Sequence, residues 1–259
     1  MSKRLYLFAN WKMYLDFDES VELARKLALK HEEASFSEKI SMTLFPSTLS
    51  FVGVQQELDE RQIPIKVGAQ NICWVEKGAY TGEVSAEMFL NVAGDYALVG
   101  HSERRHIFKE TNHEVRLKME AALNAGLIPV LCVGETEKER EENKAEEVVE
   151  AQLRAAFHNL PWPKGIPIII AYEPVWAVNT GNACDSKEAE RMHALIYKWT
   201  EVLSGGISAK VLYGGSVRKE NAAAYFQESH VDGVLVGQAS TKIETWMEIV
   251  GAAETVLNP

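Results

Sequence analysis

A carboxylate that ends an apolar strand is the residue of this sequence best suited to acid–base chemistry. The run Pro167–Tyr172 (PIIIAY) has the length and isoleucine content of a strand buried on both faces, and Glu173 follows it. Because Pro174 cannot continue the hydrogen-bond ladder of a central strand, we expect Glu173 to lie at the mouth of the sheet. A general base is commonly shielded from water in such a place. The alternative is a strand-terminal glutamate in a surface salt bridge, and this segment alone does not distinguish the two.

The residues after Glu173 have the composition of a lid. An apolar middle is followed by small or turn-forming residues, which is typical of a loop that closes over a site. We therefore predict a lid around Asn179 that consists of Pro174, Val175, Trp176, Ala177, Val178, Thr180 and Gly181.

Further polar residues stand where other apolar segments end. Asn10 and Lys12 follow the first such segment, and His101 and Glu103 follow the fourth. A lone lysine or histidine after a strand is ordinarily a surface or structural residue. In a sheet of parallel strands, however, the carboxyl ends meet at one edge, so their joint placement favours a site. The histidines show no HExxH or paired-ligand spacing, and we predict no metal site.

Two glycine-bearing turns follow the last two apolar segments. They are Tyr213–Ser216 (YGGS) and Val236–Ser240 (VGQAS), and each leads toward a helical pattern. Such turns expose backbone N–H groups, which together with a helix dipole bind anions, and after the last strands of a barrel the anion is usually phosphate. The implied ligand is a small phosphorylated molecule with a carbonyl or an acidic C–H.

Apolar segments alternate with helical patterns along the whole chain. Eight strand–helix units in 259 residues match an α/β fold of the (β/α)₈ TIM-barrel type, a single domain over residues 1–259. A doubly wound sheet is the alternative, but its glycine-rich fingerprint is missing. We interpret the charged segment Glu135–Glu150 as a solvated helix face without function. The predicted strands are Leu5–Ala9, Ile40–Phe45, Ile65–Ala69, Tyr96–Gly100, Leu127–Val133, Ile168–Tyr172, Lys210–Tyr213 and Gly233–Val236.

Composition indicates which classes of binding partner are excluded and in which cellular compartment the protein is expected. A net charge of -10 argues against nucleic acid or an anionic membrane as the main partner. No apolar run approaches the ~20 residues that a membrane span needs, and the N-terminus lacks a signal-peptide core. The three cysteines, Cys73, Cys132 and Cys184, are far apart and unpaired in pattern, as expected of reduced thiols in a cytoplasmic protein.

Several motifs together resemble one known family. NWKM at Asn10–Met13, GHSERR at Gly100–Arg105, AYEPVWA at Ala171–Ala177 and YGGS at Tyr213–Ser216 resemble triosephosphate isomerases. So do GAQN and GAYTGEVS, which lie between residues 68 and 85. The resemblance extends from residue 10 to about residue 240, and the GHSERR and AYEPVWA motifs are highly specific.

The resemblance implies interconversion of dihydroxyacetone phosphate and D-glyceraldehyde 3-phosphate, a step of glycolysis and gluconeogenesis, without metal or organic cofactor. Glu173 would be the base, and a neutral His101 would polarise the carbonyl and move protons between the two oxygens. Lys12 would offset the negative charge of the phosphate and the enediolate. Asn10 would bind substrate and hold Lys12, and Glu103 would orient the neighbouring polar groups.

The resemblance also implies the phosphate site. Substrate-binding residues would be Asn10, Lys12, Asn179, Ser216, Gly237 and Gln238. Tyr213 and Ser216 would hold the lid shut, which protects the enediolate phosphate from elimination. Three positions depart from the usual family pattern: Asn179 and Gln238 replace glycines, and Tyr14 replaces an asparagine.

A homodimer follows from the same resemblance. The long connection Asn71–Ser85 would insert into a partner subunit, with Thr81 approaching Asn10 and Lys12 of the partner subunit. Tyr14 and Trp74 would lie in this interface. Apolar surface for it would come from Ile72, Cys73, Trp74 and Val75. Two alternatives stay open, namely another phosphate-binding barrel enzyme with a larger substrate and a non-catalytic relative kept for binding.

Overall fold

Eight parallel strands close into a barrel in the order β1 to β8 in the computed structural model, which describes residues 3–34, 36–177 and 183–258. Every predicted strand is found to within one residue at either end. The predicted (β/α)₈ barrel is confirmed, and the doubly wound sheet is excluded because the sheet has no open edge. The strands are β1 (Leu5–Asn10), β2 (Ile40–Phe45), β3 (Lys66–Ala69), β4 (Tyr96–Val99), β5 (Ile128–Val133), β6 (Ile168–Tyr172), β7 (Ala209–Tyr213) and β8 (Gly233–Val236).

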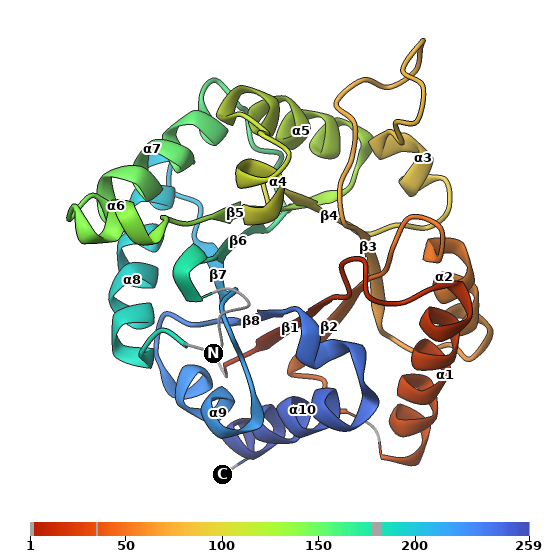
Figure 1. Cartoon of the computed structure of the whole chain (residues 1–259). Coiled ribbons are helices and arrows are strands. Elements are labelled where there is room, and N and C mark those ends of the chain that lie inside the picture. Colours follow the sequence, from red (N-terminus) through yellow and green to blue (C-terminus); the bar gives the residue numbers. More distant parts are fainter. Residues whose placement is uncertain (1–2, 35, 178–182, 259) are drawn as a thin grey trace.

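A ring of helices surrounds the barrel (Figure 1). All eight predicted helical patterns are helices, and the described chain has two further short ones, α4 and α6, after strands β4 and β5. No helix in the described ranges is both long and apolar enough to cross a membrane. The helices are α1 (Phe17–Glu33), α2 (Phe51–Glu60), α3 (Ala86–Leu90), α4 (Ser102–His106), α5 (Asn112–Ala125), α6 (Glu137–Glu141), α7 (Ala145–Phe157), α8 (Ser186–Leu203), α9 (Lys219–Gln227) and α10 (Ile243–Leu257), with 3₁₀ turns η1 (Val175–Ala177) and η2 (Gln238–Thr241).

Local sequence fixes where several of these helices begin. The side chains of Asp16 before α1 and Thr136 before α6 each accept a hydrogen bond from the backbone N–H three residues later. The residue there is a glutamate in both cases, and its carboxylate accepts the backbone N–H of Asp16 or Thr136. These capping boxes satisfy N–H groups that have no partner within the helix. At the other end of α5, Gly126 adopts φ 97°, a left-handed conformation that glycine reaches without strain.

Strand residues divide between two hydrophobic clusters because successive side chains point to opposite faces. One set packs outward against the helices. The other fills the barrel interior and forms a solid floor beneath the carboxyl ends of the strands. Its buried members are Phe8, Phe45, Tyr96, Leu98, Val130, Cys132, Ile169, Ala171, Leu212 and Leu235.

Candidate active site

A cavity of about 630 Å³ opens at the carboxyl ends of the strands. One side carries the predicted catalytic residues Asn10, Lys12, His101 and Glu173, which come from strands or loops up to 163 residues apart in sequence. The other side is formed by the turns after β7 and β8. Lining residues there include Gly214, Gly215, Ser216, Gly237 and Gln238.

Glu173 is buried at the end of β6, with 2% of its surface exposed. Its backbone N–H donates to the Val133 carbonyl at 2.7 Å, which extends the pairing of β6 with β5. One carboxylate oxygen lies 3.1 Å from His101 Nε2, and the other accepts the Ser102 N–H at 2.8 Å. The alternative of a surface salt bridge is therefore wrong for this glutamate.

The tautomer of His101 follows from its hydrogen bonds. The Glu103 backbone N–H, in the first turn of α4, donates to His101 Nδ1 at 3.2 Å. An imidazole nitrogen that accepts a hydrogen bond carries no proton, so the proton of the neutral ring is on Nε2. Nε2 then donates toward Glu173. The Glu103 N–H at the start of α4 thus leaves Nε2 as the ring nitrogen that faces Glu173.

Lys12 has a strained backbone that its neighbours hold in place. Its φ of 49° lies in the left-handed region, which non-glycine residues adopt uncommonly. Asn10 Oδ1 accepts the Lys12 N–H at 3.1 Å, and Gln70 Nε2 donates to the Lys12 carbonyl at 2.8 Å. The Lys12 ammonium reaches Glu103 Oε1 at 2.7 Å. Asn10 thus holds Lys12 as expected, and Glu103 contacts both Lys12 and His101.

Gln70 is a site residue that the sequence analysis missed. Its side-chain amide also donates to the Phe45 carbonyl at 2.9 Å, so it joins the end of β2 to the loop that carries Lys12. A signal was present, because Gln70 directly follows β3. The strand-end reasoning that selected His101 would also have selected Gln70.

The residues predicted to hold the lid, Ser216 and Tyr213, contact Ala177 and Cys184 in the described chain. Ser216 donates to the Ala177 carbonyl through its N–H at 3.1 Å and through Oγ at 2.7 Å. Tyr213 Oη accepts the Cys184 N–H at 3.0 Å. Burial is the main cause that raises the pKa of Tyr213 well above its usual value, so the phenol stays protonated. The predicted residues Val178, Asn179, Thr180 and Gly181 lie outside the described residues.

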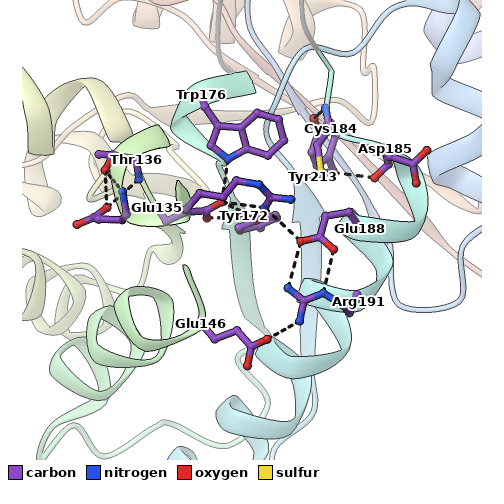
Figure 2. Close-up of polar contacts among 12 residues, drawn as sticks. Glu135, Thr136, Glu146, Tyr172, Trp176, Cys184, Asp185, Glu188, Arg191 and Tyr213 are labelled. Atoms are coloured by element: carbon purple, nitrogen blue, oxygen red, sulfur yellow. Dashed lines mark hydrogen bonds and ion pairs between the residues drawn. The ribbon is translucent and has the colours of Figure 1, made fainter. Parts of the chain in front are cut away.

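Glu135 is a second residue that the sequence analysis misjudged. The solvated face expected for Glu135–Glu150 holds for much of α6 and α7, but Glu135 itself has none of its surface exposed. Its carboxylate accepts the Trp176 Nε1–H at 2.8 Å and the Tyr172 hydroxyl at 3.1 Å (Figure 2). Glu135 therefore follows β5 in sequence but contacts the turn that follows Glu173.

The predicted interface residues lie on exposed parts of the chain. Tyr14 is 47% and Trp74 39% exposed, and Thr81 is exposed on the connection between β3 and α3, which extends from the barrel (Figure 1). Ile72 and Cys73 were expected to supply apolar surface, but both are buried within their own chain. Among the described residues, no group of three or more His, Cys, Asp or Glu side chains is arranged to hold a metal ion.

Comparisons with known proteins agree on one family. The family model described as triosephosphate isomerase matches residues 5–253. A triosephosphate isomerase of Colwellia psychrerythraea is 39% identical over 98% of this chain and 99% of its own length. Those of Marinobacter nauticus and Dictyoglomus turgidum are 39% and 38% identical over 95% and 96% of this chain, and over 96% and 99% of their own lengths.

Proposed function

The chain belongs to the triosephosphate isomerase family, and we propose that it interconverts D-glyceraldehyde 3-phosphate and dihydroxyacetone phosphate. The observation that carries the proposal is the contact of Glu173 with His101 Nε2 in the cavity that Lys12 also lines. A buried carboxylate beside a neutral imidazole and a lysine is a set of groups suited to moving a proton next to a carbonyl. The reaction belongs to glycolysis and gluconeogenesis.

In the proposed mechanism Glu173 takes a proton from one substrate carbon and returns it to the neighbouring carbon. The electron pair left behind forms an enediol(ate), while His101 donates its Nε2 proton to the carbonyl oxygen and recovers a proton from the other oxygen. Lys12 stabilises the negative charge that develops. The Nε2–H that points at Glu173 is the donor that a substrate carbonyl would engage.

The phosphate would bind at the opposite side of the cavity. Gly237 and Gln238 offer backbone N–H groups at the turn before α10, and Ser216 lies after β7. We include Asn179 in this site and assign Pro174–Gly181 to a lid, supported by the contacts of Ala177 with Ser216 and of Cys184 with Tyr213. Such a lid would exclude water and prevent phosphate elimination from the enediolate.

The test is the rate of conversion of glyceraldehyde 3-phosphate to dihydroxyacetone phosphate, with a chelator present and Glu173→Ala as the control. We expect fast turnover that resists the chelator and falls by about 10²–10⁴-fold in the variant, because a positioned base is removed. Loss of turnover to the chelator would contradict the metal-free mechanism. A wild-type protein without turnover would instead favour the non-catalytic relative.

We also propose a cytoplasmic homodimer in which Tyr14, Trp74 and Thr81 meet a second copy. Support comes from their exposure, from the extended connection between β3 and α3, and, for the compartment, from three free cysteines. Sedimentation together with activity across a dilution series tests the dimer. We expect activity to fall as the dimer dissociates, and a fully active monomer would overturn the proposal.

A further inference from the structure

Glu135 anchors the turn that follows Glu173 by both its backbone and its side chain. Its carbonyl accepts the Val175 N–H at 2.9 Å, and its Oε1 accepts the Trp176 indole N–H at 2.8 Å. Val175 and Trp176 form the first part of η1. The position of η1, two residues from Glu173, therefore depends on a carboxylate that is fully buried.

A buried carboxylate needs a compensating charge, and Arg140 on α6 provides one. Arg140 Nη1 lies 3.5 Å from Glu135 Oε1. Its guanidinium carbon lies 4.6 Å from the centre of the Trp176 ring, within the range of a cation–π contact. Arg140 thus contacts both the anchor and the anchored residue, whereas an uncompensated carboxylate at this depth would be costly.

The same guanidinium reaches a second helix. Arg140 Nη1 donates to Glu188 Oε1 at 3.1 Å, in the first turn of α8. Arg191 holds Glu188 from the other side with two hydrogen bonds of 2.9 and 3.1 Å, and it also pairs with Glu146 on α7 (Figure 2). A continuous series of charged contacts therefore connects η1 to the start of α8.

The start of α8 follows the other flank of the predicted lid. Cys184, whose N–H donates to Tyr213, lies two residues before the first residue of α8. Arg140 therefore stands between two structures: η1, directly after Glu173, and the helix that follows Cys184. Arg140 is not among the residues that line the cavity, so any effect on the reaction must pass through its neighbours.

We propose that Arg140 is a positioning residue for the reaction proposed above: it compensates Glu135, clamps Trp176 and ties η1 to α8 through Glu188. Only the expected change in rate depends on that proposed function; the ordering of the turn by Arg140 does not. The chain of contacts keeps the turn after Glu173 in one orientation, and Glu173 with it. Misplacement of a catalytic group by about 1 Å can cost a factor on the order of 10² in rate.

The test is Arg140→Gln, which keeps a polar side chain but shortens it and removes its charge and most of its donors. We expect kcat to fall by about 10–100-fold while KM changes by less than about threefold, because the base is displaced and the phosphate turns are not. Arg140→Lys, which restores the charge without the planar guanidinium, should recover part of the loss. Arg154→Gln is the matched control, because Arg154 pairs with Glu150 on the exposed face of α7.

A second measurement does not depend on activity. Protein grown with 5-fluorotryptophan gives a ¹⁹F spectrum without substrate, and Trp176→Phe identifies the Trp176 resonance. We expect Arg140→Gln to shift or broaden that resonance and Arg154→Gln to leave it unchanged. If the wild-type protein is inactive, the proposed function fails, but the spectrum still shows whether Arg140 orders the turn.

Glu188→Gln tests the connection to α8. It removes the charge that joins Arg140 to α8 and leaves Arg140, Glu135 and Trp176 intact. We expect a smaller loss of kcat than in Arg140→Gln, and little further loss when the two changes are combined, because both act through one series of contacts. A Glu188→Gln variant identical to the wild type would overturn the link to α8. Arg140→Gln with wild-type kcat and an unmoved Trp176 resonance would overturn the whole inference.

Discussion

Two buried carboxylates, Glu173 and Asp232, stand at opposite ends of the barrel and show what separates the proposed base from a structural carboxylate. Glu173 follows β6 and Asp232 precedes β8, with 2% and 8% of their surfaces exposed. Asp232 accepts hydrogen bonds from the Val211 N–H at 2.9 Å, from Lys210 Nζ at 3.1 Å and from the Tyr197 hydroxyl. Its charge is compensated by a lysine and its oxygens are occupied by the protein.

Glu173 has partners of a different kind. It accepts one backbone N–H, faces Nε2 of an imidazole whose Nδ1 accepts a backbone N–H, and lines the cavity. Among the residues that the structure describes, no lysine or arginine lies at hydrogen-bond distance from its carboxylate. Burial alone would have selected both carboxylates. The cavity, the imidazole partner and the carboxyl end of the strand are the features that support the proposed role of Glu173 as the base.

Replacing each carboxylate by its amide tests whether Glu173 and Asp232 have different roles. We expect Glu173→Gln to lower kcat by about 10²–10⁴-fold, because the amide cannot take a proton. Asp232→Asn should lower the free energy of unfolding by about 1.5–3 kcal/mol, because hydrogen bonds to a charged group are lost, and leave kcat within about twofold. Steady-state kinetics and urea unfolding on both variants measure the two effects.

The opposite pattern would show that the two ends have been assigned to the wrong roles. An Asp232→Asn variant with wild-type stability would mean that Tyr197 and Lys210 satisfy one another without the carboxylate. A Glu173→Gln variant that retained turnover would place the base elsewhere in the cavity.

Local patterns in the sequence were sufficient to predict the barrel and the positions of several residues that line the cavity. Strands with period-two or fully apolar patterns are defined by neighbouring residues, so their ends, and with them Lys12, His101 and Glu173, could be placed from the sequence. Which charged side chains become buried could not. Glu135 is buried because Trp176, 41 residues later, and Tyr172, 37 residues later, meet it in space.

The backbone conformation of Lys12 could not be predicted from the sequence either. Lys12 has a positive φ, and its carbonyl accepts a hydrogen bond from Gln70, which is 58 residues away. A lysine has no local preference for that conformation, so contacts from distant residues help to hold it. Long-range contacts of this kind decide which polar residues serve the site.

A smaller effect is expected for a third buried titratable group, His193 on α8, which has none of its surface exposed. His193 Nδ1 lies 3.1 Å from the His230 carbonyl, and burial, the largest cause, lowers its pKa to about 4 although the His230 carbonyl opposes the shift. The unfolded chain binds this proton near pH 6.5 and the folded chain near pH 4. The stability that the neutral ring contributes is therefore fully present above about pH 6.5 and is lost as the pH falls toward 4.

We expect the free energy of unfolding to decrease by about 2 kcal/mol from this group between about pH 7.5 and about pH 5. His193→Gln should show a correspondingly flatter dependence, measured as urea unfolding at both pH values. The contact of Glu190 with His230, at 2.7 Å, is present in both proteins, so the difference between the two slopes isolates His193. Equal slopes would mean that His193 binds its proton with the same affinity in the folded and the unfolded chain, and that its burial does not lower its pKa.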